Sequence, residues 1–513
     1  MPFIDLNSNA IDFDAASFDV VIVGAGAAGI LLAVELSKKK KKVLLLESGH
    51  FEEDSQRQAL NEVVQTGKNL SNSVWGRKRA IGGTTIAWGG QSLPYGRLDF
   101  ANRDWLQYSG WPLPYETLAT EYKMANKFMG IDELDYEDDI FRLLKMKRAG
   151  FNEALIHHHF AKWAPEPNFR KIYNDHLLQH TTLVYNAVLA KIEPGADGRI
   201  VSVTVNNFKG ESFSIGVSRL ILAAGTIETI RILLNQEMHT AGGMGNHSGW
   251  LGKNFMDHPC IEAGVVETRD RWKLQAGFNT HFRGNRKYSI RMSMAEAYQK
   301  EQRLLNGSAS LFFAYDAEDT DPYEKIRELI RTKKMPAMAL PSMSDINSYL
   351  LSTVAYAFPR FIYKHKARIK LIMMMEQEPT PDSYIGLSDE KDIHGTRRAL
   401  IHWKITHKTW DSVLHLSHAV SGELQRLSLG TVKLHDHIRA ENPDWESHLA
   451  DVCHHMGGTR MSATPAEGVV DTDLKVWGHD NLYVCSASVF PTTSHSNPTL
   501  TLLALAERLA GQL

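Results

Sequence analysis

The hydrophobic pattern of the N-terminal region changes twice within 30 residues. "FDVVIVGAGAAG" (18–29) begins as an apolar run rich in β-branched residues, which predicts a buried strand, and ends in glycines. "AAGILLAVELSKK" (27–39) has apolar residues at helical spacing, and "KVLLLE" (42–47) is a second short apolar run. The pattern therefore predicts a strand, a tight turn, a helix and a second strand, as in an α/β fold.

Further along the chain, residues 115–180 are predicted to be mainly helical and rich in loops. Residues 260–320 and 385–405 alternate as strands do. Three shorter apolar runs also predict strands, namely "TTLVYNAVLAKI", "GRIVSVTVNN" and "SRLILAAGT". The last segment, "NPTLTLLALAERLAGQL", predicts a helix with Asn497 as N-cap and Pro498 at its first position.

Two segments allow more than one interpretation. The three histidines 157–159 are consecutive and lack the spacing of helical metal ligands, so we expect a loop or surface position. Residues 321–370 are predicted to be helical and end in "YLLSTVAYAFPRFIYKHKARIK", which mixes aromatic and basic residues. This segment favours a packed helix with extended Lys and Arg side chains, and a membrane surface or a partner subunit is the alternative.

Composition restricts the class of protein. A chain of 513 residues is long enough for two domains, and its net charge of -2 gives no overall attraction for nucleic acid or anionic lipid. Three widely spaced cysteines indicate neither a disulfide framework nor a zinc site. The first 21 residues contain no Lys or Arg and no long apolar run, and no stretch of 18 apolar residues occurs. We therefore expect a cytoplasmic protein without a transmembrane segment; an oligomer is left open.

Gly24, Gly26 and Gly29 form a G-x-G-x-x-G sequence between the first predicted strand and helix. Such glycines permit a tight turn, close approach of a pyrophosphate and close helix–strand packing, while the helix N-terminus attracts phosphate. Glu47 ends the second strand about 20 residues later, where an acidic side chain can bind a ribose hydroxyl. The motif predicts dinucleotide binding and disfavours NADP, but it does not distinguish NAD from FAD.

Several segments, in order along nearly the whole chain, resemble the glucose–methanol–choline (GMC) oxidoreductases. They are "RAIGGTTIAWGGQ", "GWPLPYETL", "SRLILAAGTIETIRILL", "LGKNFMDHP", "DSYIGLSDEKDIHG", "CHHMGGTRM" and "VCSASVFPTTSHSNPTLTLLALAERLA". "HMGGTRM" and "NPTLT" are most similar to the pyranose oxidase-like, bacterial sugar-oxidising branch. The second Gly-rich segment would bring backbone amides close to a flavin, which an NAD enzyme does not need.

The resemblance implies FAD as cofactor, and two departures from the family pattern qualify this. Ala87 stands before Trp88, where pyranose oxidases with covalent flavin have a His, so we expect FAD to be bound non-covalently. Ser486 replaces an Asp common in relatives, which puts one flavin contact in doubt. The cofactor-binding residues expected are Gly24, Gly26, Ala27, Ala28, Gly29, Glu47, Gly82, Gly83, Thr84, Val188, Ala224, Ser488, Pro498 and Thr499.

For the catalytic residues, the family pattern is a His, two residues, and then Gly with Thr, Ser or Gly. His455 fits this register, whereas His454 misses it by one residue. We therefore expect His455 to be the base and His454 to face the protein interior or a neighbouring strand. Asn497 stands at the family's second catalytic position, although its side chain could instead cap the last helix. His495 is a rival for the role of Asn497.

These observations predict a Rossmann-like FAD-binding domain interleaved with a substrate domain that has a mainly antiparallel sheet and helices. The FAD domain is expected at residues 15–110, 180–260 and 450–513, and the substrate domain at 111–179 and 261–449. The family implies oxidation of a CH–OH group of a sugar, glycoside or polyol to a carbonyl by hydride transfer to flavin N5. A non-redox flavin-containing lyase and a non-sugar alcohol are the alternatives. Oxygen, a quinone or another molecule is left open as the electron acceptor.

Overall fold

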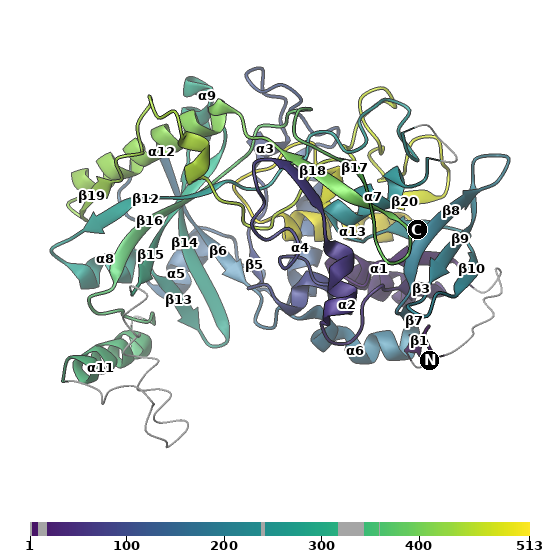
Figure 1. Cartoon of the computed structure of the whole chain (residues 1–513). Coiled ribbons are helices and arrows are strands. Elements are labelled where there is room, and N and C mark those ends of the chain that lie inside the picture. The colour runs from purple at the N-terminus through teal and green to yellow at the C-terminus, as the bar shows by residue number, and fades with distance from the viewer. Residues whose placement is uncertain (1–2, 9–17, 238–241, 316–342, 359) are drawn as a thin grey trace.

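The computed structural model describes residues 3–8, 18–237, 242–315, 343–358 and 360–513. Within these ranges two lobes lie side by side, one built on a parallel sheet and the other on an antiparallel sheet (Figure 1). The predicted fold class is confirmed. The exact division into domains stays a prediction, because the sheets alone do not define domain boundaries.

A six-stranded parallel sheet forms the centre of the first lobe, among the described residues. The two predicted N-terminal strands lie next to each other in it, with Val20 paired to Val43, and both are fully buried. The strands 20–23, 43–46 and 220–222 are buried at every position, so they are apolar throughout instead of alternating. The strand order is β1 (Ile4–Asp5), β7 (Thr182–Tyr185), β3 (Val43–Leu46), β2 (Val20–Val23), β11 (Leu220–Leu222) and β20 (Leu482–Val484).

Helix α1 (Ala27–Lys38) follows β2 directly, and the C-terminal helix α13 (Pro498–Gln512) packs beside it. Eight of the 12 residues of α1 are buried, so this helix is part of the core instead of a surface cover. The N-termini of both helices help to line the same cavity.

The second lobe is built on an antiparallel sheet whose two faces differ. Met292, Ala309 and Met373 lie opposite one another on one face and are buried beneath helix α12 (His407–Arg426). Arg291 and Ser310 belong to the other, more polar face. The strand order is β19 (Thr431–Leu434), β12 (Cys260–Glu267), β16 (Arg368–Met375), β15 (Gly307–Ala314), β14 (Arg286–Met294), β6 (Ile156–Trp163) and β5 (Gln91–Ser92), with β13 (Thr280–Arg283) also paired to β14.

Other elements connect or cover these two sheets. A small sheet joins β17 (Tyr384–Lys391), β18 (Arg397–Trp403) and β4 (Val64–Gly67), and a meander joins β8 (Val188–Pro194), β9 (Ile200–Asn206) and β10 (Ser212–Gly216). The other α-helices in the part of the chain that the structure describes are α2 (Ser55–Gln58), α3 (Arg97–Phe100), α4 (Ala119–Phe128), α5 (Asp138–Leu144), α6 (Phe169–His180), α7 (Thr226–Leu234), α8 (Arg271–Phe278), α9 (Glu296–Gln302) and α11 (Met343–Ala357).

The prediction that histidines 157–159 lie in a loop or at the surface is wrong. They belong to β6, which pairs antiparallel with β14 between Ile156 and Trp163. His158 and His159 are buried, at 5% and 4% exposure. Three consecutive polar residues do not show the apolar–polar alternation that predicts a strand. In the structure, His158 faces aromatic core residues and His159 faces the polar side of the sheet.

A buried ion pair connects segments of the two lobes. Arg103 follows α3, Glu376 follows β16, and their charged groups approach to 2.5 Å with both side chains fully buried. Glu376 also accepts a hydrogen bond from the backbone N–H of Asn306. Removal of either charge would leave the other buried without compensation. This ion pair therefore fixes the loop that contains Arg103 against the end of β16.

Candidate active site

A cavity of about 570 Å³ lies at the carboxyl ends of strands β2, β3 and β11 of the parallel sheet. Its walls come from the β2–α1 turn, the Gly-rich segment, β11, the segment around His454 and the start of α13. The predicted cofactor-binding residues that line it are Gly24, Gly26, Ala27, Ala28, Glu47, Gly83, Thr84, Val188, Ala224, Pro498 and Thr499. These predicted residues thus converge on one cavity from six separate segments of the chain.

Glu47 fixes the shape of the turn at one end of the cavity. Its Oε2 accepts a hydrogen bond from Ala25 N at 2.8 Å, and its Oε1 accepts one from Gly49 N at 2.7 Å. Oε1 also contacts Ser48 Oγ at 3.4 Å, whereas Oε2 retains a further acceptor site, and Glu47 lines the cavity. Burial raises the pKa of this carboxyl, while the two amides and the nearby Arg79 act in the opposite direction.

The glycines of this region leave space that side chains would fill. A Cβ at Gly26 would meet no atom within 4 Å, whereas a Cβ at Gly29 would lie 1.9 Å from the Gly24 carbonyl oxygen. Gly26 therefore faces open space at the cavity, and Gly29 permits α1 to pack against β2, as the motif predicts. A glycine-lined cradle at a helix N-terminus fits the pyrophosphate of a dinucleotide.

Three predicted cofactor residues, Gly29, Gly82 and Ser488, do not line the cavity. Gly82 has φ of 106°, so it serves the turn that brings Gly83 against Gly26. Ser488 is buried, and its hydroxyl accepts from Thr459 Oγ1 at 2.6 Å and contacts Ser486 Oγ. Ser486 itself lines the cavity, where the expected Asp is replaced.

The segment that carries His454 and His455 is held against the segment "NFMDHP" by a short antiparallel bridge. Met256 and Met456 exchange backbone hydrogen bonds of 2.9 and 2.8 Å. This register places Asp257 opposite His455 and His258 opposite His454. Asp257 Oδ1 further accepts from the backbone N–H groups of His258 and His454, at 2.6 and 3.0 Å. The bridge thus sets the position of both histidines.

His454, not His455, contacts Asn497. Its Nε2 lies 3.2 Å from Asn497 Nδ2, and its Nδ1 lies 2.9 Å from His258 Nδ1. With the Asn497 amide as donor, Nε2 of His454 carries no proton and Nδ1 carries the hydrogen. The Asn497 side chain makes no capping hydrogen bond to α13, so the alternative role as a helix cap is not seen.

His455 has a different environment. Its Nε2 lies 3.7 Å from Asp257 Oδ2 and has no hydrogen-bond partner among the described residues, and its ring stacks against Phe255. Both histidines line the cavity, and His454 also contacts His258 on the neighbouring paired segment. The backbone is not a regular strand here, since Cys453 has φ of 61°.

Burial keeps the two histidines neutral. Burial, with the charge of Arg291, lowers the pKa of His454 to about 4. Burial, with Arg77 and His454, lowers the pKa of His455 to about 3. Burial raises the pKa of Asp257 to about 7, although hydrogen bonds from the backbone N–H groups of His454 and His258 act to lower it. Both imidazoles are therefore uncharged at neutral pH, and each has one ring nitrogen that can accept a proton.

His495, the rival to Asn497, lines a second cavity of about 710 Å³ beside β6 and β14. Its ring lies 5.7 Å from that of His159, and its Nδ1 has no partner among the described residues. Arg291, on the polar face of the antiparallel sheet, donates to Gln91 Oε1 at 2.8 Å, and its charge contributes to lowering the pKa of His495. The rival thus stands near the polar sheet face, while Asn497 stands in the first cavity.

Sequence reasoning missed Asp257 and His258 as members of the site. Both occur in "LGKNFMDHP", a segment that resembled the family but to which no role was given. Both are fully buried, and Asp257 Oδ2 and His258 Nε2 have no hydrogen-bond partner among the described residues. Two adjacent buried titratable residues were the signal that could have identified this segment.

Comparison with known proteins defines the class to which this fold and site belong. Residues 379–506 match the family model "GMC oxidoreductase", and residues 22–51 match "NAD(P)-binding Rossmann-like domain". The chain therefore contains a GMC oxidoreductase region at residues 379–506 and a Rossmann-like nucleotide-binding segment at residues 22–51.

Individual relatives are distant. The fructose dehydrogenase large subunit of Gluconobacter japonicus is 23% identical over 64% of this chain and 53% of its own. A long-chain-alcohol oxidase of Arabidopsis thaliana is 22% identical over 95% of this chain and 67% of its own. Pyridoxine 4-oxidase from Mesorbium loti, a solved structure, has a TM-score of 0.53 and 17% identity and covers 96% of this chain and 99% of its own. The chain thus spans about half of the fructose dehydrogenase subunit, and the structural likeness shows the fold alone.

Proposed function

We propose that the protein is an FAD-dependent oxidoreductase that oxidises a CH–OH group of a sugar, glycoside or polyol to a carbonyl. The observation that carries this proposal is the contact between His454 and Asn497 at the wall of the glycine-lined cavity. Two matched relatives are named for oxidation of a sugar and of an alcohol, and a third is a C-glycoside 3-oxidase of Arthrobacter globiformis, 43% identical over 61 residues.

The cavity residues divide into those that would hold FAD and those that would act on the substrate. Gly24, Gly26 and the N-terminus of α1 would hold the pyrophosphate, and Glu47 a ribose hydroxyl. Gly83 and Thr84 would approach the flavin together with the N-terminus of α13. With Ala87 in place of a His, the attachment is non-covalent. When bound, FAD supplies the acceptor for the two electrons of the oxidation.

The residues of this chain would remove the hydroxyl proton. A hydroxyl placed between His454 and Asn497 can donate its hydrogen to Nε2 of His454 and accept one from Nδ2 of Asn497. His258 would hold the His454 ring through Nδ1. The geometry therefore favours His454 as the base over His455, the residue that the motif register predicts, because His455 lacks a contact with Asn497.

One anaerobic experiment tests this function. Purified protein, reconstituted with FAD if necessary, is mixed with a panel of sugars, glycosides and polyols while the flavin absorbance is followed. Bleaching by at least one compound supports the proposal, and the bound flavin released by denaturation shows that attachment is non-covalent. A protein that binds no flavin would refute it. Conversion of substrate without bleaching would indicate a non-redox lyase, and bleaching only by long-chain alcohols a different substrate class.

A further inference from the structure

Helix α11 carries a row of apolar side chains that face solvent. Ile346, Leu350 and Val354 are 42%, 57% and 59% exposed, and Phe358, just after the helix, is 75% exposed. Because residues four apart lie on one side of a helix, these four side chains form a single row, the α11 stripe. Contiguous exposed apolar surface of this kind marks interaction sites in proteins.

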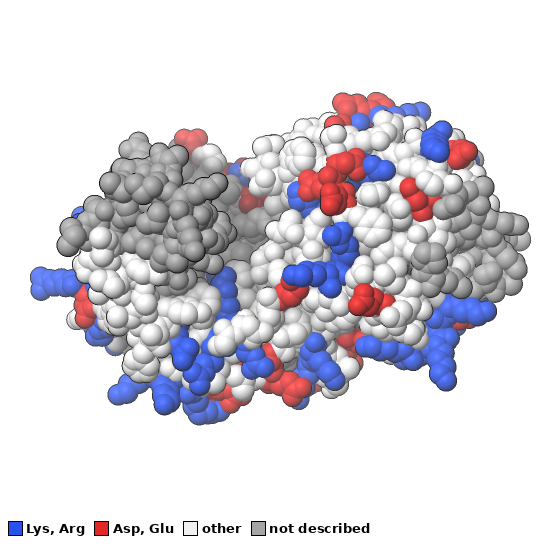
Figure 2. Space-filling view, turned by 90° about the horizontal axis from the view of Figure 1, so that it is seen from below, with Lys and Arg blue, Asp and Glu red and all other residues white. Residues whose placement is uncertain are grey.

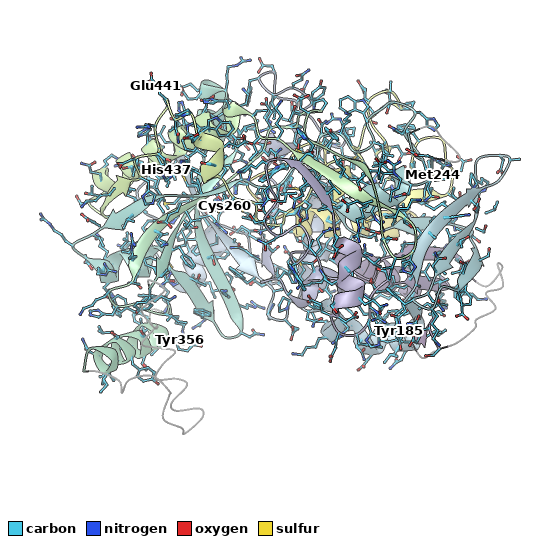
Figure 3. The ribbon with its side chains drawn as sticks, in the orientation of Figure 1. Tyr185, Met244, Cys260, Tyr356, His437 and Glu441 are labelled. Atoms are coloured by element: carbon cyan, nitrogen blue, oxygen red, sulfur yellow. The ribbon has the colours of Figure 1, made fainter. Side chains whose placement is uncertain are left out.

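The opposite side of α11 is firmly packed. Ser348 and Ser352 are buried, and Ala355 belongs to a small core with Phe361 and Tyr363, against which Trp272 of α8 packs. The helix is therefore anchored by one side, and the exposed stripe is presented on the other. In Figure 3, Tyr356 marks this helix at the edge of the molecule, away from Cys260 near its centre.

Basic residues surround the base of this helix. Residues 360–370 contain five Lys or Arg and no Asp or Glu, and the same is true of residues 271–287. The two segments are joined: Lys364 N donates to Gln275 Oε1 at 2.8 Å, and Phe282 N donates to the Arg360 carbonyl oxygen at 2.8 Å.

Carboxylates neutralise only part of this positive charge. Lys370 pairs with Glu262 at 2.9 Å, and Arg286 lies 3.7 Å from Asp132. Among the described residues, no carboxylate lies within ion-pair distance of the exposed side chains of Lys273, Arg283, Arg360 and Lys366. Figure 2 shows blue side chains beside white ones at this end of the molecule, next to the grey part.

We propose that the α11 stripe and the basic residues beside it bind the surface of a membrane that contains anionic lipids. Apolar side chains on one side of a helix can enter the boundary between headgroups and acyl chains, while nearby Lys and Arg contact lipid phosphates. A second copy of the chain would present the same positive charges and repel this surface. The net charge of -2 does not oppose this attraction, because the basic residues act locally.

No helix among the described residues has both the length and the hydrophobicity to cross a bilayer. Attachment through the α11 stripe would be peripheral and reversible, with both apolar and electrostatic contributions. It would place α8 and the β13–β14 hairpin next to the lipid headgroups, since Arg360 and Lys364 are hydrogen-bonded to them.

The test is vesicle co-sedimentation of the full-length, flavin-loaded protein. Vesicles of phosphatidylcholine with about 30% phosphatidylglycerol are compared with vesicles of phosphatidylcholine alone, at about 0.1 M and 0.5 M salt. We expect binding to the anionic vesicles at low salt, with roughly fivefold weaker binding for each Lys or Arg that is replaced. Absence of binding to anionic vesicles, or equal binding to both kinds, would overturn the proposal.

Matched double variants separate the stripe from general surface hydrophobicity. Leu350→Gln/Phe358→Gln should bind at least about tenfold more weakly. Val201→Gln/Ile393→Gln, which changes two side chains that are 52% and 60% exposed elsewhere, should bind like the unchanged protein. Equal losses in both variants, or a dimer in sedimentation velocity that only the first variant dissociates, would contradict the proposal. Thermal unfolding and flavin content confirm that both variants are folded.

Discussion

The glycine turn around Gly26 and the histidine cluster around His454 line the same cavity, but they are assembled differently. The glycine turn is closed by contacts within one strand–helix–strand unit, such as the Glu47–Ala25 hydrogen bond between residues 22 apart in sequence. The histidine cluster joins residues 43 and 196 apart, through the contacts of His454 with Asn497 and His258. A local motif thus defines the first region, whereas only the folded chain defines the second.

Substitution of the two adjacent histidines should sharpen this comparison most. His454→Ala should slow flavin reduction by roughly 10²–10⁴-fold with flavin retained, because the general base is lost. His455→Ala should have a much smaller effect on reduction, since His455 does not contact Asn497. Stopped-flow measurement of flavin bleaching at saturating substrate distinguishes them. The reverse order of the two effects would restore the assignment that the motif register predicts.

A side chain at Gly26 tests the glycine turn separately. Gly26→Val should leave the fold intact, because its Cβ meets no protein atom within 4 Å, but it should fill the cavity. An overpacking cost of ~1–3 kcal/mol corresponds to roughly 5- to 150-fold weaker FAD binding. Titration of the apoprotein with FAD measures this change, and Gly422→Ala in α12, where space is also free, is the control. Unchanged FAD affinity in the valine variant would place the cofactor elsewhere.

Removal of the Asn497 amide should have a smaller effect than removal of the imidazole. Asn497→Ala loses one hydrogen bond to the site, which corresponds to roughly 2- to 12-fold slower flavin reduction. Asn497 makes no capping bond, so the thermal stability of α13 should change little. A drop in melting temperature without a change in reduction rate would instead show that Asn497 acts in helix formation.

The smallest expected effect concerns pH. Since the neutral form of His454 accepts the proton, kcat/KM should stay level as pH falls below the ordinary pKa of histidine and decrease only near about 4. Arg291 contributes to the low pKa of His454, so Arg291→Gln should move this acid limb to higher pH. Arg283→Gln, an exposed residue outside the site, should leave the profile unchanged. An acid limb near the ordinary histidine pKa would contradict the burial argument.

These contrasts explain which features could be predicted from the sequence. The strand, turn and helix at 18–47 and the strands at 384–403 were predictable, because hydrophobic period and glycine spacing are local properties. The strand through histidines 157–159 was not, since its burial depends on β14, more than 120 residues away. The spacing also could not decide between His454 and His455. In "HHMGGT", two residues separate His454 from Gly457, and two residues separate His455 from Gly458, so each histidine fits one of the two glycines.

The exposed α11 stripe shows the same limit. Its aromatic and basic composition favoured a packed helix, and one side of α11 is indeed packed on α8. The four apolar residues on the other side remain in solvent. Periodicity shows which side of a helix is apolar, but it does not show whether the rest of the chain covers that side. The part of the predicted helix before residue 343 lies outside the described residues.

The two faces of the antiparallel sheet bear on how new substrate preferences can arise in such a protein. Alternate residues of β14 and β15 face either α12 or the polar side, as Met292 and Arg291 do. A mutation at Arg291 or Ser310 therefore changes the chemistry of the polar side without altering the packing beneath α12. Selection can act on one set of positions while the other set maintains stability, so a change on the polar side need not begin with a compensating change in the core.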